Sequence, residues 1–406
     1  MKGGFVVLTQ QPKFGPLSGV KVINAALSVA GPFAAQLMAE WGADVLWLEN
    51  VKTRDIVRNG TGYFAEAERK NERSMPLNIP TPEGKEILFK LLKETDIYIE
   101  ASKGGQYDRW GLSDEVMWEA NPKLVIVHIS GFGQTGLPEY VRRGSYDPIA
   151  QAFGCYMQYN GFPDRDPIPA NPQPCDFATG LMAGFAALAA LNRAKETGKG
   201  ESIDLAQYEV MIRILNSYPV EYLNLGIKYE RAGNRNAKCV CFGLYRCKDG
   251  KCIYIAGIGA GISKKLAEFL GLEYGSELLP AGLPYYSPKS EGGQLLEGSL
   301  LKYLADKTAA EAETELLAQG IPTQRVMDLE DAVVNPQYIA RETFTEWEAV
   351  DGRTIKGVNI IPRFKQAPGM VWRGCPTKGM DTRETLEHLG YGEEEISRLY
   401  EDGIVC

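Results

Sequence analysis

Short apolar segments alternate with amphipathic ones through the first half of the chain. Residues 19–24 (G-V-K-V-I-N) and 44–49 (D-V-L-W-L-E) are each typical of a buried strand. The segment 32–41 between them predicts a helix, because Pro32 suits its first turn and Gly42 follows its last. Strand, helix and strand in such short order predict a right-handed βαβ unit with parallel strands.

The same alternation continues beyond this unit. Residues 81–93 predict an amphipathic helix with Thr81 as its N-cap. Further strands are expected at 96–100 and 124–130, and residues 202–205 lead into a helix expected at 208–215. Pro76 places the short segment 74–79 at an edge of the sheet, because proline has no N–H to donate. Residues 1–223 therefore predict a large α/β domain with a Rossmann-like parallel sheet.

The pattern changes after about residue 223. Strand-like alternation, basic residues and many turns occupy 228–249, and a strand is expected at 252–256. Helices are then expected at 263–270, 294–305 and 309–319. We expect residues 224–331 to form a smaller α+β domain, and residues 332–406 to return to the large domain.

One long apolar segment is made largely of small residues. Residues 172–193 read P-Q-P-C-D-F-A-T-G-L-M-A-G-F-A-A-L-A-A-L-N-R, which predicts a helix that packs closely on its neighbours. A proline-broken loop precedes this helix, and Asp176 falls at its N-cap or first turn. Aspartate is a preferred structural cap. A carboxylate at the positive end of a helix is also suited to act as a nucleophile. Position alone leaves both interpretations open.

Composition narrows the classes of function. The chain has 52 acidic and 44 basic residues and a formal net charge of −8, which argues against a nucleic-acid binder. The apolar run near the N-terminus is too short for a secretory signal. No stretch is expected to reach the length that spans a membrane. We therefore expect a cytoplasmic protein that binds neither nucleic acid nor membrane.

Motifs for metals and nucleotide cofactors are weak. Four of the eight cysteines cluster, namely Cys239, Cys241, Cys247 and Cys252. Their spacing is not that of a zinc site, and buried free thiols are expected instead. His128 lies in an apolar strand segment, which argues against a histidine-based site. The turn after the first strand contains only Gly31, and 257–262 lacks a third glycine, so a dinucleotide fingerprint is absent.

Basic and glycine residues gather where predicted strands end. Lys103 and Arg109 lie in the loop after 96–100, and the turn 131–136 (G-F-G-Q-T-G) follows the next strand. Ligands of open α/β sheets bind outside the carboxyl ends of strands, so Lys103 and Arg109 are candidate phosphate contacts. The polar, basic segment 50–73 is either a solvated loop or an arm around a phosphate-bearing ligand.

Several segments, in order, resemble the class III CoA-transferase family (the formyl-CoA transferase family), in particular its carnitine-type members. They are A-G-P-F-A-A-Q-L-M-A-E-W-G-A-D-V-L-W-L-E-N (30–50), N-E-R-S-M-P-L-N (71–78), S-G-F-G-Q-T-G (130–136), A-L-N-R-A-K-E-T-G-K-G-E-S-I-D-L-A (190–206), N-P-Q-Y-I-A-R-E-T-F (335–344) and W-R-G-C-P-T-K-G-M-D-T-R (372–383). The resemblance is spread over most of the chain. It implies CoA transfer between carboxylic acids and an interlocked homodimer.

The resemblance also assigns residues. It implies that Asp176, four residues before Gly180, is the nucleophile that forms a covalent aspartyl intermediate, and that Lys103 and Arg109 contact CoA. Carnitine-type members carry a second arginine where this chain has Trp110, so it stays open which cation contacts the nucleotide. The implied ligands are CoA, acyl-CoA and small carboxylic acids such as carnitine, crotonobetaine or γ-butyrobetaine. No permanently bound cofactor and no metal are implied.

The sequence leaves the identity of the donor and acceptor acids open. A quaternary ammonium favours aromatic or acidic surroundings, and a set of such residues precedes Asp176: Tyr140, Tyr146, Asp147, Tyr156 and Tyr159. Tyrosines at this density are also common in packing. A CoA-transferase for a 2-hydroxy or aryl acid is one alternative. An acyl-CoA racemase-type or inactive CoA-binding relative is another, although racemases of the family use a His/Asp pair and His128 lies in a strand.

Overall fold

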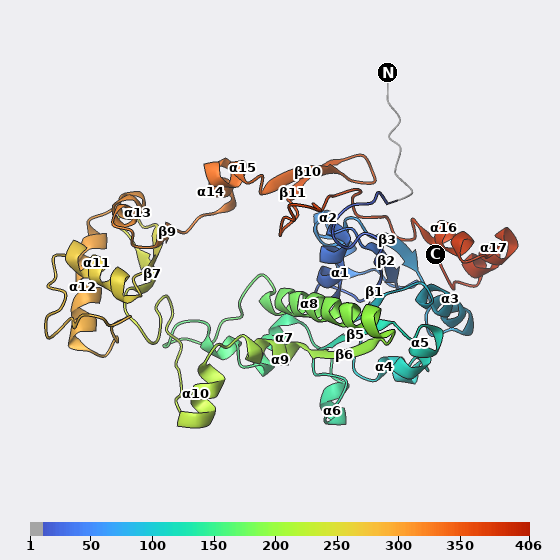
Figure 1. Cartoon of the computed structure of the whole chain (residues 1–406), viewed down its shortest axis with the longest axis horizontal. Helices are drawn as coiled ribbons and strands as arrows, with labels where there is room; N and C mark the ends of the chain where they lie inside the picture. The colour runs from blue at the N-terminus through green and yellow to red at the C-terminus, as the bar shows by residue number, and fades with distance from the viewer. Residues whose placement is uncertain (1–10) are drawn as a thin grey trace, which may run out of the picture. The chain divides into compact units, whose positions relative to one another are not determined.

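The computed structural model describes residues 11–406, which form two compact units. Within the described residues, unit 1 comprises 11–154, 170–214 and 339–406, and unit 2 comprises 155–169 and 215–338. The chain therefore enters unit 2 twice and ends in unit 1. Figure 1 labels the elements of both units along the chain.

Unit 1 is built on a six-stranded sheet in the order β3-β2-β1-β4-β5-β6, in which every neighbouring pair is parallel. Its strands are β1 (Lys21–Ala25), β2 (Asp44–Glu49), β3 (Arg73–Pro76), β4 (Ile97–Glu100), β5 (Val125–Ser130) and β6 (Glu201–Ala206). This arrangement confirms the expected α/β class with a Rossmann-like parallel sheet. Pro76 lies in edge strand β3, where the missing N–H breaks no ladder.

Helices cover both faces of this sheet. On one face, α1 (Ala30–Glu40) and α8 (Pro174–Thr197) pack their alanines against valines and isoleucines of β1, β2, β4 and β5. On the other face lie α3 (Pro82–Leu92), α5 (Asp114–Ala120), α16 (Thr382–His388) and α17 (Glu393–Glu401). Figure 1 shows the two groups of helices on opposite sides of the strands. Thr81 caps α3 as predicted, since its side chain accepts the N–H of Gly84.

Helix α8 corrects one expectation. An 18-residue window of this 24-residue helix has a mean hydropathy of 1.4, so α8 is long and apolar enough to cross a membrane by length and composition alone. The expectation that no stretch reaches such a length is therefore wrong. Its buried side, which includes Ala183 and Ala187, packs on α1 and the sheet. Core helices pass the same test of length and composition, and these contacts are those of a core helix.

The remaining elements of unit 1 are short. They are η1 (Ile56–Arg58), α2 (Tyr63–Arg69), α4 (Gln106–Arg109), α6 (Pro138–Val141), α7 (Asp147–Phe153), α9 (Gln207–Arg213) and the hairpin of β10 (Phe344–Glu348) and β11 (Thr354–Val358). Helix α15 (Pro336–Ala340) spans the boundary between the units.

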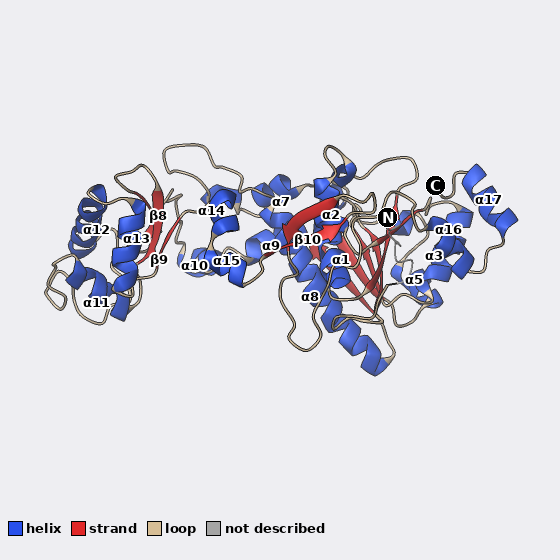
Figure 2. Ribbon diagram, turned by 90° about the horizontal axis from the view of Figure 1, so that it is seen from above, coloured by secondary structure: helices blue, strands red, loops and turns tan. Residues whose placement is uncertain are grey.

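Unit 2 has its own sheet and core. Three antiparallel strands, β7 (Phe242–Arg246), β8 (Cys252–Ala256) and β9 (Thr323–Arg325), form the sheet that Figure 2 shows in red. The helical elements of unit 2 are η2 (Met157–Tyr159), α10 (Tyr218–Leu225), α11 (Ala260–Phe269), α12 (Glu291–Ala305), α13 (Ala309–Ala318) and α14 (Leu329–Val334). The four clustered cysteines are free thiols on and beside β7 and β8.

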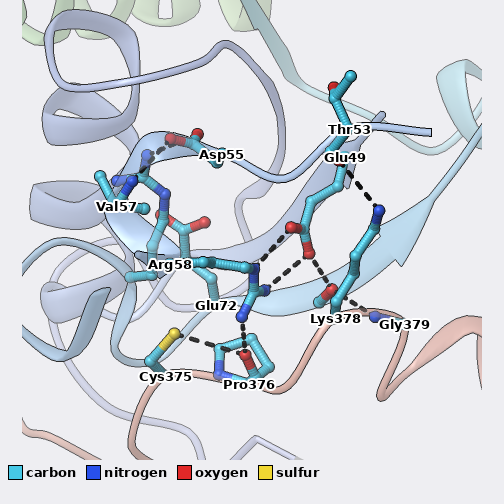
Figure 3. A network of polar contacts seen from close by, with 12 residues as sticks. Glu49, Thr53, Asp55, Val57, Arg58, Glu72, Cys375, Pro376, Lys378 and Gly379 are labelled. Carbon is cyan, nitrogen blue, oxygen red and sulfur yellow. Dashed lines mark hydrogen bonds and ion pairs between the residues drawn. The ribbon is translucent and has the colours of Figure 1, made fainter. Parts of the chain in front are cut away.

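The basic segment 50–73 is largely internal to unit 1. The buried Arg58 guanidinium donates to both carboxylate oxygens of Glu49 at 2.7 Å and to the carbonyl of Pro376 at 2.8 Å. Figure 3 shows this network joining the end of β2 to the C-terminal part of the chain. Arg69 pairs with Asp55 at 3.3 Å.

A third buried cation of this segment, Lys70, lies 2.6 Å from Glu40. For Arg58, Arg69 and Lys70, both the solvated-loop and the phosphate-arm hypotheses are therefore wrong, because these cations neutralise carboxylates of the same unit. Lys52 and Arg54 remain exposed.

Candidate active site

Asp176 and Lys103 lie near the carboxyl edge of the parallel sheet, because Asp176 bonds to Gln207 directly after β6 and Lys103 is in the loop after β4. The strand order reverses between β1 and β4, so the chain leaves β1 towards α1 on one face and leaves β4 towards α5 on the other. Such a switch point opens a crevice in which ligands of α/β sheets bind. The loops 26–29 and 101–105 follow these two strands.

Close packing of α8 on α1 fixes the start of α8 over this edge. A Cβ placed on Gly180 would lie 2.6 Å from the carbonyl oxygen of Ala30, the first residue of α1. No other residue fits there without a shift of the backbone. The edge-to-face contact of Phe177 with Phe33, at 4.8 Å between ring centroids, closes the same junction. The close approach of α1 and α8 therefore explains why Gly180, four residues after Asp176, is a glycine.

Asp176 is in the first turn of α8, where it is not the N-terminal cap. The N-cap residue is Gln173, whose side chain makes no capping bond, and the first-turn amides are instead capped by Asp147, whose Oδ2 accepts the N–H of Cys175 at 2.7 Å and of Asp176 at 3.1 Å. Asp147 begins α7 and is buried. Because Asp147 already accepts these amides, Asp176 does not serve as the structural cap of α8.

The carboxylate of Asp176 is nearly buried, with 7% of the residue exposed. Its Oδ1 accepts a hydrogen bond of 2.6 Å from Nε2 of Gln207. Burial, followed by repulsion from Asp147, raises the pKa of Asp176 to about 6, although the bond from Gln207 opposes the change. The group is thus mostly ionised at neutral pH and poorly solvated, which are the properties of a reactive carboxylate.

A buried amide holds the loop that leads into α8. Gln151 of α7 donates to Asp147 and to the carbonyl of Ala170, and its Oε1 accepts the Ala170 N–H. Both bonds to Ala170 are 2.9 Å long. One side chain therefore fixes both the capping carboxylate and the chain before Pro172.

Lys103 lies at the same edge, after β4. The residue is exposed, and its side chain lies beside Gly144, which is three residues before Asp147. A Cβ placed on Gly144 would be 3.5 Å from Cε and 3.8 Å from Nζ of Lys103. The N–H of Gly105 donates to Oε1 of Gln134 at 3.0 Å. This bond joins the Lys103 loop to the glycine turn 131–136.

Arg109 is held differently. It ends the short helix α4, is exposed, and donates to Oε1 of Gln106 at 2.9 Å.

An apolar hollow of about 560 Å³ lies beside Gly144, the neighbour of Lys103. Its wall includes Phe132, Arg143 and Phe153.

His128 is engaged on both ring nitrogens. Nδ1 lies 2.8 Å from Glu100 and Nε2 lies 2.8 Å from Asp114. Burial lowers the pKa of His128, but the bonds to the two carboxylates outweigh it and raise the pKa to about 10. Glu100 also accepts the N–H of Ser102 at 2.6 Å, so this ion triad supports the loop that carries Lys103.

The predicted aromatic and acidic set is divided between the two units. Tyr140 packs on Phe132 and Phe153 in unit 1, with the guanidinium of Arg143 at 4.0 Å from its ring. Tyr146, in unit 1, is 69% exposed. Tyr156 and Tyr159 belong to unit 2, where Tyr159 packs on Tyr218. Asp147 contacts Asp176, since its Oδ2 accepts the Asp176 N–H at 3.1 Å.

Sequence reasoning missed the roles of Asp147, Gln151 and Gln207. Gln207 directly follows a parallel strand, and ligand-binding residues are common at such positions. This position could have identified Gln207 as a site candidate. Asp147, followed by a proline, marks a helix start, but nothing local indicates that it caps α8. Among residues 11–406, no group of three or more His, Cys, Asp or Glu residues is arranged to hold a metal ion.

Comparisons with known proteins match nearly the whole chain. Residues 17–382 match the model of CoA-transferase family III. A CAIB/BAIF family protein from Brucella suis has 27% sequence identity and a TM-score of 0.75, and the match covers 93% of this chain and 100% of that one. Rv3272 from M. tuberculosis has 21% identity and a TM-score of 0.77, and the match covers 92% of this chain and 100% of that one, which shows a shared fold.

Proposed function

We propose that this chain, which belongs to CoA-transferase family III, moves CoA between two small carboxylic acids by way of Asp176. Family membership makes the chain a transferase whose substrates are CoA thioesters. The observation that carries the assignment to Asp176 is its buried carboxylate, which is freed from capping by Asp147 and held by Gln207.

The proposed reaction has two symmetrical halves. Asp176 attacks the thioester carbonyl of the donor, and the C–S bond breaks to give a mixed anhydride and the CoA thiolate. The thiolate attacks the aspartyl carbonyl of the anhydride, which releases the donor acid and leaves an aspartyl-CoA thioester. The acceptor carboxylate then attacks this thioester. The released thiolate takes the acyl group from the second anhydride, which regenerates Asp176.

Gln207 is suited to assist the steps at the aspartyl carbonyl. Negative charge develops on a side-chain oxygen of Asp176 when the thiolate or the acceptor attacks, and Oδ1 already accepts the Gln207 amide. The nearby helix amides are engaged elsewhere. Those of Cys175 and Asp176 donate to Asp147, and that of Phe177 donates to the carbonyl of Gln173. A side-chain donor is therefore favoured at this position.

The substrates are proposed from the carnitine-type resemblance: crotonobetaine, γ-butyrobetaine and carnitine as acids, with CoA carried as a thioester. Lys103 and Arg109 are the proposed contacts for CoA. We further propose a cytoplasmic homodimer with no permanently bound cofactor. The engagement of both His128 nitrogens by carboxylates favours a transferase over a racemase-type enzyme, because neither nitrogen is free to move a substrate proton.

The test uses purified wild type and Asp176→Ala with crotonobetainyl-CoA and L-carnitine, and follows carnitinyl-CoA by mass. Transfer by the wild type and loss in the variant are expected. Asp164→Asn, an exposed carboxylate of unit 2, is the control and should retain activity. Transfer only to a 2-hydroxy or aryl acid would keep the nucleophile and replace the substrate. Full activity of Asp176→Ala would refute the mechanism.

A further inference from the structure

The loop that carries Lys103 contains two consecutive glycines, so its conformation depends on contacts from outside the loop. Gly104 and Gly105 follow Lys103, and Gly105 has a φ of +68°. Glycine loses more backbone freedom on ordering than any other residue. At the start of the loop, Glu100 accepts the N–H of Ser102 at 2.6 Å. The end of the loop needs a second contact.

Gln134 of the turn 131–136 makes this second contact. Its Oε1 accepts the N–H of Gly105 at 3.0 Å. The backbone N–H of Gln134 donates to both carboxylate oxygens of Asp204 at 2.9 Å, and Asp204 lies on β6. Gln134 is therefore fixed to β6 by its backbone, and its side chain holds the loop that follows β4.

The two segments also pack directly on each other. A Cβ placed on Gly104 would lie 2.7 Å from the carbonyl oxygen of Gly133 and 2.3 Å from Cγ1 of Val141. No other residue fits at this position without a shift of its neighbours. The same segment continues to Gly144, beside the side chain of Lys103. The loop therefore lies against a formed surface, to which the Gln134 bond ties it.

The Gln134 amide is retained at a cost in stability. Its Nε2 is buried and has no acceptor among residues 11–406. The amide cannot be reversed without loss of the bond, because Oε1 accepts the Gly105 N–H. A buried donor without an acceptor destabilises a fold, and methionine would fill a similar volume without one. A residue that costs stability while it fixes a loop is typical of a functional site.

We propose that Gln134 is a positioning residue for CoA, which holds the Lys103 loop in the conformation where the ammonium meets a phosphate of CoA. The inference rests on the proposed contact of Lys103 with CoA. A loop that is ordered beforehand loses less entropy when its ligand binds, so its contact with the ligand contributes more to affinity. The effect of Gln134 is therefore on the affinity for CoA.

Isothermal titration of the full chain with CoA, at low and at high KCl concentration, tests the proposal. Gln134→Met should weaken CoA about fivefold, in line with the loss of one hydrogen bond. Salt screens the contact of Lys103 with phosphate, so the affinity of the wild type should fall as KCl rises, and that of Gln134→Met should fall less. The urea midpoint should stay close to that of the wild type, because the substitution removes one unsatisfied donor and leaves another. Gln319→Met, at an exposed glutamine of unit 2, is the matched control and should behave as the wild type does.

Lys103→Ala and the double variant separate failure of this inference from failure of the proposed CoA contact. Lys103→Ala should weaken CoA about tenfold, and Gln134→Met added to it should weaken CoA no further. Unchanged affinity in Lys103→Ala would refute the CoA contact and this inference with it. A loss in Lys103→Ala but none in Gln134→Met would refute the positioning role alone. Additive losses in the double variant, or a salt dependence in Gln134→Met equal to that of the wild type, would also overturn it, because Gln134 would then not act through Lys103.

Discussion

Asparagine at position 176 would keep the shape of the side chain and remove a buried charge. Burial and repulsion from Asp147 raise the pKa of Asp176 from its ordinary value of 3.8 to about 6. A carboxyl group whose pKa is higher in the folded than in the unfolded protein lowers the stability at every pH where it is ionised in both states. The difference between the two pKa values corresponds to about 3 kcal/mol above pH 6. We therefore expect Asp176→Asn to be more stable than the wild type by about this amount at pH 8.

The pH dependence follows from the same values. The advantage of Asp176→Asn should decline as the pH falls through 6 and vanish below 3.8, where the aspartate is protonated in both states. The asparagine oxygen can still accept the bond from Gln207, so little packing changes.

Urea unfolding at pH 8, 6 and 4, at one protein concentration, measures the free energy of unfolding of both proteins. Exposed Asp164→Asn should show no such advantage. Equal stability of Asp176→Asn and wild type at pH 8, or an advantage that does not vary with pH, would refute the reasoning.

Four further predictions concern the same site. Gln207→Leu should lower kcat about 10²- to 10³-fold, as loss of one oxyanion donor does, and should move the acidic limb of the pH–rate profile upward; an unchanged kcat would contradict this. Asp147→Asn should move that limb downward, because the repulsion that raises the pKa of the nucleophile is removed. Lys103→Ala should raise KM for acyl-CoA about tenfold, in line with the loss of one charged hydrogen bond, and leave KM for an acyl-pantetheine unchanged; equal effects on both donors would exclude a phosphate contact. Gly180→Ala should cost about 1–3 kcal/mol in thermal unfolding through overpacking, whereas Gly184→Ala, whose Cβ would have ordinary contacts, should be neutral or stabilising.

Much of the large unit follows from local sequence. The strand at 44–49 matches its predicted bounds, as does 252–256 in unit 2, and the alternation of strands with amphipathic helices is enough to predict the parallel sheet. Periodicity also predicts a closely packed helix at α8, because its small residues leave room for a neighbour. These features depend on residues a few positions apart, which a sequence displays directly.

Long-range pairings explain what the sequence could not predict. Asp147 caps a helix that begins 27 residues later, and Gln207 bonds to a carboxylate 31 residues before it. Arg58 reads as a solvated or phosphate-binding cation, yet it is paired with Glu49 and with a carbonyl near the C-terminus. Polar residues carry no periodic pattern that reveals such partners, so the partners emerge only from the folded chain.

Trapping the covalent intermediate tests the central claim most directly. The wild type is incubated with an acyl-CoA donor and then with hydroxylamine, which converts an enzyme-bound thioester or anhydride into a hydroxamate, and the modified peptide is located by mass spectrometry. The proposed mechanism predicts a hydroxamate at Asp176 that depends on the donor and is absent from Asp176→Asn. Transfer of CoA by the wild type without modification of Asp176, or with modification of another carboxylate, would contradict it.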